Sequence, residues 1–213
     1  DVFSRVVYGA RVSLYVGLTA VAMGTAVGMA VGFTSGSLGG RTDLVVQRLV
    51  DALLAFPPLV LALVTVAALQ PSPTALAAAI GAAFAPQVAR LARAQALAAR
   101  KEMYVLAARA VGAGWGRMLG RYVLPNSVAP VVVLATGSVG EAMVVEAALS
   151  FFGLGVPPPE PSWGRILQEG VHRYLEAAPW LTLFPILALA LVVAASSLLA
   201  DALRDHLDPW LRR

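Results

Sequence analysis

The 213-residue sequence is poor in charged residues and rich in hydrophobic ones. Charged residues make up 13% of the chain, which is about half the share found in ordinary soluble proteins. Hydrophobic residues make up 59%, and residues 12–40, 52–89 and 177–200 contain no Asp, Glu, Lys or Arg. A helix that crosses a bilayer needs about 20 predominantly apolar residues. The sequence therefore predicts an integral membrane protein.

Several kinds of site are excluded by what the sequence lacks. With no cysteine, it has no disulfides, thiolate zinc sites, iron–sulfur clusters or cysteine nucleophiles. Its two histidines, His172 and His206, are far apart and stand in no Ser/His/Asp pattern, so neither a metal site nor a catalytic triad is expected. The single lysine, Lys101, follows Arg100 and is not part of a Gly-Lys-Ser/Thr phosphate loop. We expect no enzyme activity and no bound cofactor, so ATP and magnesium chemistry has to come from another chain.

Five apolar stretches are candidate membrane spans. Helices are expected because a lipid-exposed backbone must satisfy its own hydrogen bonds. The predicted class is therefore an all-α polytopic membrane protein. The predicted spans are at about residues 12–33, 49–69, 74–90, 126–149 and 180–201. The predicted organisation is an external amphipathic lead-in at 1–11, a membrane domain at 12–202 with a cytoplasmic loop at 91–125, and a cytoplasmic tail at 203–213.

Basic residues predict the orientation. Twelve of the sixteen lie in the segments that follow the first, third and fifth spans, and four lie on the other side. Because cytoplasmic loops carry the excess of Lys and Arg, the N-terminus is expected outside and the C-terminus in the cytoplasm. The net charge of +4 is explained by these loops and requires no nucleic-acid partner. A chain that starts outside without a signal peptide is unusual, so we interpret it as five spans of an original six.

Small residues recur every four positions in the first span, at Ala20, Gly24, Gly28 and Gly32. Such a stripe lets two helix backbones approach closely in lipid. Packing within the chain and packing against another subunit both explain it, and we favour packing within the chain.

The segment from residue 90 to 125 carries seven basic residues and is predicted to be a helix–turn–helix. Its alanine-rich first part is strongly helix-forming. Gly112, Gly114 and Gly116 then interrupt it, and Gly112 suits the left-handed position that ends a helix. A second short helix leads to Pro125. Two interpretations remain open: a basic helix resting on anionic lipid, or a docking element for a cytoplasmic partner.

Two motifs in this segment resemble the EAA loop of bacterial ABC-importer permeases. They are residues 106–112 (Leu-Ala-Ala-Arg-Ala-Val-Gly) and 121–126 (Arg-Tyr-Val-Leu-Pro-Asn). Further stretches make the chain similar to the C-type permease subunit of dipeptide, oligopeptide and nickel importers, over essentially its whole length. These stretches are residues 4–14, 146–156 with Pro-Ser-Trp-Gly at 161–164, and Asp-Ala-Leu-Arg-Asp-His-Leu-Asp-Pro at 201–209.

The resemblance implies the type-1 ABC transmembrane fold in the inner membrane. It implies a second homologous permease, two ATP-binding subunits and an extracytoplasmic substrate-binding protein as partners, with ATP hydrolysed on separate chains. The family normally has one more N-terminal span. The loop corresponds to the family's coupling helix, which sits in a cleft of the ATPase. Docking would then involve Ala107, Ala108, Arg109, Gly112, Ala113, Trp115 and Arg117.

The sequence departs from the family pattern at two positions. The acidic first residue of the EAA motif is Leu106, and a common histidine before Leu-Pro-Asn is Tyr122. These changes affect one polar contact to the ATPase and preserve the helix–Gly–helix pattern. An ATPase-independent secondary transporter or channel is the alternative function, and it would need charged or interrupted spans that carry an ion path. An intramembrane hydrolase is disfavoured because catalytic groupings are absent.

Three acidic residues lie in or near the spans. A charge there costs about 2.5–3.5 kcal/mol on insertion scales, so it normally faces protein or water. Asp51, Glu141 and Glu146 are thus candidates for the translocation path or for polar contacts between helices. Glu141 and Glu146 would point about 140° apart on a helix and so are not a catalytic pair. We expect Glu146 to anchor the end of the fourth span, whereas Glu141 either lines the path or pairs with an arginine.

The segment 155–178 is expected outside. It is rich in proline, and Trp163 and Trp180 fit the aromatic belt of a membrane protein. The resemblance makes this the face that meets the substrate-binding protein, although belt placement and loop rigidity explain any single residue equally well.

Overall fold

The computed structural model describes residues 2–207, and every regular element in that range is a helix, which confirms the predicted all-α class. Residues 208–213, which include the end of the tail motif and Arg212 and Arg213, lie outside the described residues. In chain order the helices are α1 (Val2–Leu38), α2 (Gly40–Leu54), α3 (Pro58–Ala67), α4 (Pro73–Ala99), α5 (Met103–Ala110), α6 (Trp115–Met118), the π-helical turn η1 (Leu119–Val123), α7 (Leu124–Ser127), α8 (Ala129–Phe151), α9 (Trp163–Arg173) and α10 (Trp180–Leu207).

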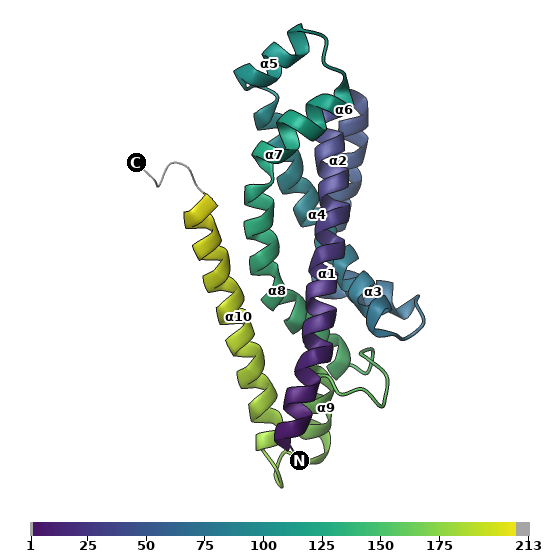
Figure 1. The fold of residues 1–213 in the computed structure, drawn as a ribbon. Helices are drawn as coiled ribbons and strands as arrows, with labels where there is room; N and C mark the ends of the chain where they lie inside the picture. Colours follow the sequence, from purple (N-terminus) through teal and green to yellow (C-terminus); the bar gives the residue numbers. More distant parts are fainter. Residues whose placement is uncertain (1, 208–213) are drawn as a thin grey trace.

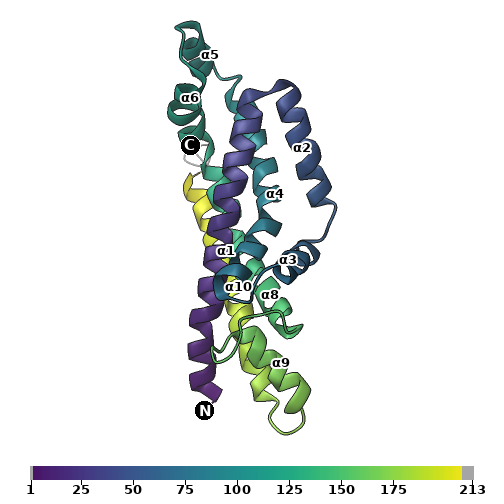
Figure 2. The same ribbon diagram turned by 90° about the vertical axis from the view of Figure 1, so that its right-hand side faces the viewer.

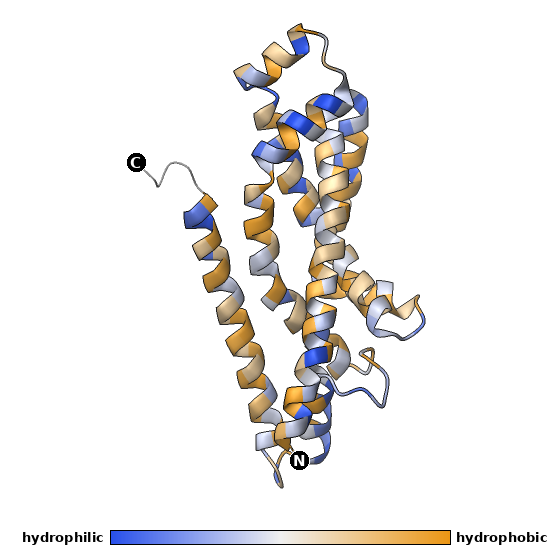
Figure 3. Ribbon diagram, in the orientation of Figure 1, coloured by the Kyte–Doolittle hydropathy of each residue, from blue (hydrophilic) through white to orange (hydrophobic). Residues whose placement is uncertain are grey.

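The helices form an elongated bundle with two distinct ends (Figure 1). Four of the described helices, α1, α4, α8 and α10, are long and apolar enough to cross a membrane. The N-terminus and α9 lie at one end of the bundle, and α5 and α6 lie at the other. Hydrophilic residues gather at both ends, whereas hydrophobic residues dominate between them (Figure 3). This distribution is the one expected of a polytopic membrane domain.

The second predicted span is broken rather than straight. Helices α2 and α3 meet at an angle of 94°, with Phe56 and Pro57 at the break. Consecutive prolines explain it: Pro57 has an extended ψ of 139°, and Pro58 begins α3. A residue before proline is disfavoured in the helical region. The predicted span at 49–69 is therefore two helices at a sharp angle and not one straight helix, and the break between α2 and α3 is visible in the turned view (Figure 2).

Helices α1 and α4 extend beyond the spans predicted at 12–33 and 74–90. Helix α1 is continuous from Val2, so the lead-in predicted at 1–11 is part of the same helix as the first span. Helix α4 continues beyond residue 90 to Ala99. At 1.5 Å per residue, the 37 residues of α1 extend about 55 Å, well beyond a hydrocarbon core of about 30 Å.

The glycine stripe of α1 packs against α4. A Cβ atom built on Gly24 would lie 2.6 Å from the carbonyl oxygen of Gly81, and one built on Gly28 would lie 2.6 Å from that of Ala85. A Cβ atom built on Gly32 would likewise overlap the carbonyl oxygen of Ala89. Such close approach leaves no room for a side chain, so packing of the stripe within the chain is confirmed.

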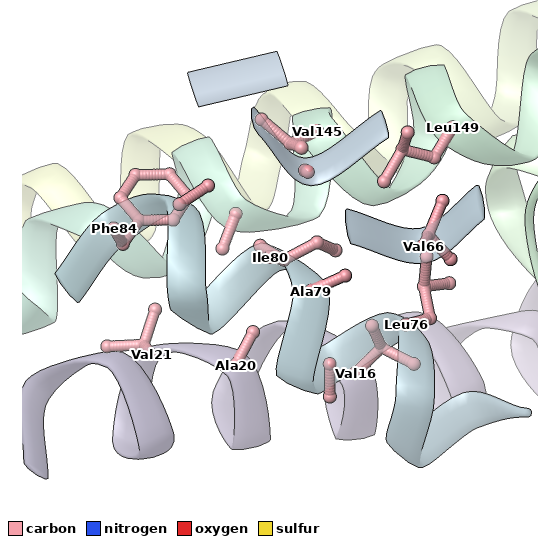
Figure 4. Packing of buried hydrophobic residues seen from close by; sticks show 14 of the residues in the cluster. Val16, Ala20, Val21, Val66, Leu76, Ala79, Ile80, Phe84, Val145 and Leu149 are labelled. Carbon is pink, nitrogen blue, oxygen red and sulfur yellow. The ribbon is translucent and has the colours of Figure 1, made fainter. Parts of the chain in front are cut away.

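Three hydrophobic clusters follow one another along the bundle, and both α1 and α8 contribute to all three. The central cluster joins α1, α3, α4 and α8 (Figure 4). A second cluster includes Phe33 of α1 and Val105 of α5, and a third includes Trp163 and Ile166 of α9. The small helices at the two ends are thus packed on the same pair of long helices.

Candidate functional site at the two ends of the bundle

The basic segment is a broken helix followed by a turn and three short helical pieces. The structure ends α4 at Ala99 and starts α5 at Met103, which corrects the single alanine-rich helix expected up to Gly112. At this break Arg100 donates from Nη1 to the carbonyl oxygen of Gly36, 3.0 Å away, near the end of α1. The connection between α4 and α5 therefore stays against α1 through Arg100, and α5 itself turns away from the bundle.

Gly112 ends α5 as predicted. Its φ of +80° lies in the left-handed region, which glycine adopts without the steric cost that a Cβ imposes. The backbone N–H of Ala113 donates to the carbonyl oxygen of Ala108 at 3.0 Å, and that of Gly112 donates to Arg109 at 3.0 Å. The predicted helix–turn–helix is confirmed, with α6, η1 and α7 forming the second half.

Six of the seven docking candidates reach the surface of this end. Ala107, Arg109, Gly112, Trp115 and Arg117 are exposed and Ala113 is half-buried. Ala108 is buried, so it supports α5 from beneath instead of offering a contact. Beside them Met103 and Val111 are 79% and 86% exposed.

An open cavity of about 190 Å³ lies between the two halves of the segment and the ends of α1 and α4. Its lining mixes apolar side chains with two guanidinium groups. The lining residues are Ser37, Leu38, Arg100, Val105, Leu106, Arg109, Trp115, Met118, Leu119 and Val123. An apolar cavity with a few convergent polar groups is suited to receive protruding side chains of another molecule.

This end of the chain is electropositive. Arg109, Arg117 and Arg121 are exposed, and none forms an ion pair with another residue in the part of the chain that the structure describes. Burial and the nearby Glu102 carboxylate raise the pKa of Tyr104, so its phenol remains neutral. A surface of this kind attracts an acidic protein or an anionic membrane.

Two ion pairs attach α2 to α4 near the same end. Asp43 is buried and binds Arg93 through both carboxylate oxygens, each at 2.6 Å. Asp51, a candidate for the path, binds Arg90 at 2.8 Å, and both of these side chains are largely exposed. Asp51 thus makes a contact between helices, the second of the two roles expected for it.

At the opposite end, Glu146 is fully buried between α1, α8 and α9. It accepts hydrogen bonds from the hydroxyl groups of Ser13 at 3.0 Å and Ser150 at 2.7 Å. Ser13 in turn accepts from the backbone N–H of Trp163 at 3.1 Å. These bonds tie the end of α8 to two other helices, the kind of anchoring expected of Glu146.

Glu141 lies on a different face of α8. Its side chain is exposed near the middle of the helix, and it has no hydrogen bond or ion pair to other residues within 2–207. The arginine pairing considered for it is therefore absent from the described residues.

The histidines occupy unrelated places. His172 lies on α9 with Nδ1 2.9 Å from the carbonyl oxygen of Gln168, and its ring lies 5.4 Å from that of Phe151. His206 lies in the last turn of α10. No group of three or more metal-binding side chains occurs among residues 2–207.

The serines that surround Glu146 were not predicted from the sequence. Ser13, Ser150 and Ser162 are all buried, although isolated serines in apolar helices carry little signal alone. One signal was available: Glu146 and Ser150 are four residues apart, which places them on one face of a helix.

The protein-family comparison matches residues 24–213 to the binding-protein-dependent transport system inner membrane component family. A dipeptide transport system permease protein of Alkalihalophilus pseudofirmus is 40% identical over 120 residues, 56% of this chain and 39% of that protein. A putative peptide permease protein of Brucella ovis is 48% identical over 118 residues, 55% of this chain and 39% of that protein. The alignments thus span well under half the length of these relatives.

Two solved structures share the fold. A chain from inward-facing conformations of the MetNI methionine ABC transporter has a TM-score of 0.70 and 17% identity, covering 93% of this chain and 96% of that one. A chain from an amino acid ABC transporter with histidines has a TM-score of 0.65 and 18% identity, with 94% of each chain covered. These likenesses place the helices of this chain in the fold of ABC-transporter chains.

Proposed function

The chain belongs to the binding-protein-dependent transport system inner membrane component family, and from this membership we propose that it is a permease subunit of an ABC importer for peptides. The relatives described above are named as dipeptide and peptide permeases, which supports peptides as the substrate class, with nickel as the other substrate that the C-type resemblance suggests. The second permease, two ATP-binding subunits and an extracytoplasmic binding protein are part of the proposal.

The observation that carries the proposal is the exposed surface of α5, Gly112 and α6. It combines protruding apolar side chains, Met103 and Val111, with unpaired arginines beside an open cavity. A lipid-resting helix would need one apolar face and one basic face. Here apolar side chains such as Leu106 line the same hollow as Arg100 and Arg109, which favours a protein partner over the lipid surface.

In the proposed mechanism, nucleotide binding draws the two ATP-binding subunits together, and the segment 103–118 moves with them. The motion passes through Val105 to the cluster that contains Phe33 of α1 and Val131 of α8, because well-packed interiors transmit displacement. The two nucleotide states must contact the segment differently, since a partner shifts a conformational equilibrium only through differential affinity.

Glu141 is proposed to line the translocation path. An unpaired carboxylate at the middle of a membrane helix is costly against lipid, so its exposed face requires water or another protein chain. In an assembly of two permeases, that face of α8 would border the passage between them. A carboxylate there would interact with the ammonium group that every free peptide carries at its N-terminus.

The test is deletion of residues 112–116 in the assembled transporter, reconstituted in vesicles with the binding protein. Membrane insertion should remain intact, whereas substrate-stimulated ATP hydrolysis should be lost. Substitution of Gly116 by alanine is the matched control, since a Cβ there meets open space. Normal stimulation in the deletion variant would contradict the assignment. Purification of the detergent-solubilised chain as a self-sufficient homo-oligomer without an ATPase would instead support a secondary transporter or channel.

A further inference from the structure

Two chains of hydrogen bonds run from the first turn of α9 to the two oxygens of Glu146. In one, the Trp163 N–H donates to the Ser13 hydroxyl at 3.1 Å, and Ser13 donates to Oε2 at 3.0 Å. In the other, the Arg165 N–H donates to Ser162 at 3.3 Å, Ser162 donates to Ser150 at 3.4 Å, and Ser150 donates to Oε1 at 2.7 Å. Three helices therefore meet at one carboxylate.

Each chain of hydrogen bonds begins at a backbone N–H of α9, and this sets which group donates and which accepts along the chain. A backbone N–H can only donate, so each serine that accepts from α9 has its own proton available for the next acceptor. Glu146 ends both chains because a carboxylate accepts at each oxygen. A glutamine could accept at only one of the two positions.

Close packing also stabilises this junction of α1, α8 and α9, which we call the joint. A Cβ atom on Gly164 would lie 2.6 Å from both the Cα of Ala147 and the Cβ of Ser150, so α9 begins in direct contact with α8. On the α1 side, the indole Nε1 of Trp163 donates to the carbonyl oxygen of Val6 at 2.8 Å. An ion pair between Arg5 and Glu169, at 3.1 Å, adds an exposed contact further along α9.

The other part of α9 is accessible. An open cavity of about 320 Å³ is lined by Arg165, Gln168, Glu169, His172 and Arg173, and residues 171–177 are exposed. Helix α9 thus has one polar face that another protein can reach and one that is fixed to α1 and α8. Because α1 continues to Phe33 in the cluster beneath α5, a displacement of α9 is carried along α1 to the basic segment.

We propose that Glu146 is a positioning residue that joins α9 to α1 and α8 as one rigid unit, through which docking of the binding protein on α9 stimulates ATP hydrolysis at the other end. This inference rests on the proposed function, since it requires an external binding protein and an associated ATPase. It assigns to Glu146 a role in signal transmission, in which the residue contacts neither substrate nor nucleotide.

The first experiment compares Ser13→Ala and Glu146→Gln with Ser138→Ala in the reconstituted complex. Ser138 is the matched control because it is a buried serine whose hydroxyl donates only within its own helix, to Leu134 at 2.9 Å. Loss of one buried hydrogen bond should shift the equilibrium between attached and detached α9 by up to about tenfold. We expect both joint variants to lose most of the stimulation by binding protein while keeping basal hydrolysis, and Ser138→Ala to keep both.

A second measurement reports the joint directly. Because the chain has no cysteine, Val7→Cys on α1 and Val171→Cys on α9, both exposed positions, would be its only two thiols for spin labels. The distance distribution between the labels should be narrow in the parent complex and broad in the Ser13→Ala and Glu146→Gln backgrounds. A short bifunctional thiol reagent that bridges Arg5→Cys and Glu169→Cys should restore stimulation to the Ser13→Ala variant.

The outcomes separate this inference from the proposed function. Unchanged stimulation in both joint variants, or an unchanged distance distribution, overturns the inference while the transporter remains an ABC permease. A parent complex that contains no ATPase overturns the proposed function. Failure of the bridged variant to regain stimulation also overturns the inference, because a positioning role requires only that α9 be held in place.

Discussion

Ser13 on α1 and Glu146 on α8 are joined by a 3.0 Å hydrogen bond although 133 residues separate them in the sequence. Both side chains are fully buried, so the bond forms away from water, where an unpaired polar group is costly. The Ser13 hydroxyl also accepts a hydrogen bond from the backbone N–H of Trp163, the first residue of α9. One serine therefore links α1 to both α8 and α9 at the end of the bundle opposite the basic segment.

Truncation of Glu146 should destabilise the chain far more than truncation of Glu141. Glu146→Ala leaves two buried hydroxyl groups without their acceptor, at an expected cost of about 2–4 kcal/mol. Glu141→Ala removes a side chain with no partner among residues 2–207 and should change stability by less than about 0.5 kcal/mol. Thermal unfolding of the detergent-solubilised chain, followed by tryptophan fluorescence, measures both. Equal unfolding midpoints would contradict the structural role of Glu146.

Neutralising Glu141 should affect transport instead. In the assembled transporter, Glu141→Gln should lower the uptake of peptides with a free N-terminal amine relative to N-acetylated peptides, because only the amine carries a positive charge. Uptake of radiolabelled peptide into vesicles measures the ratio, and Glu141→Asp, which preserves the charge, is the control. A ratio unaffected by Glu141→Gln would remove this residue from the proposed path.

The contact between α1 and α4 should not tolerate a single added methyl group. Gly24→Ala would place a Cβ 2.6 Å from a backbone oxygen, and overpacking of this kind typically costs about 1–3 kcal/mol. Gly137→Ala on α8 is the control, because its Cβ would meet only the Cβ of Ala200 at an ordinary 3.6 Å. In size-exclusion profiles recorded after heating, the folded peak of Gly24→Ala should disappear at a lower temperature than that of the parent chain. The folded peak of Gly137→Ala should persist to the parent temperature.

The two ion pairs between α2 and α4 should differ in strength. Arg93→Ala leaves the buried Asp43 carboxylate unpaired, at a cost of about 1–3 kcal/mol once partial solvent exposure is allowed for. Arg90→Ala breaks a pair whose side chains are 64% and 45% exposed, so the loss should stay below about 1 kcal/mol. Unfolding midpoints of the two variants test this order, and a larger loss for Arg90→Ala would reverse it.

Gly112 should be required for assembly because of its backbone conformation. Gly112→Ala forces a non-glycine residue to a φ of +80°, at a cost of about 1–2 kcal/mol, while the added Cβ meets no atom within 4 Å. The amount of ATP-binding subunit that co-purifies should fall, whereas it should not fall for Gly116→Ala, which has open space and no positive φ. Equal recovery in the two variants would show that the turn is not part of the docking surface.

Much of the fold follows from hydrophobic runs and the distribution of charge. The positions of the apolar helices and the end of α5 at Gly112 could be predicted because each depends on local chemistry. The break between α2 and α3 was missed although Pro57 and Pro58 signal it, because the apolar run continued through them. The end of α4 before Arg100 carries no comparable local signal and coincides with the tertiary contact of Arg100 to α1.

The site was predictable to a similar degree. A resemblance in the basic segment identified the docking candidates, yet the burial of Ala108 depends on packing beneath α5. The convergence of Ser13, Ser162 and Glu146 depends on how α1, α8 and α9 cross, and no pattern in one sequence places residues from three separate helices together.

The close approach of Gly24 and Gly81 also limits how the sequence can evolve. A Cβ on Gly24 would strike the carbonyl oxygen of Gly81, and a Cβ on Gly81 would strike that of Ala20 at 2.7 Å. Neither position can compensate for a larger residue at the other, because both are already glycine and the obstructing atoms belong to the backbone. Where this contact is retained, descendants of the sequence are expected to keep both glycines while the outward-facing positions of α1 drift freely.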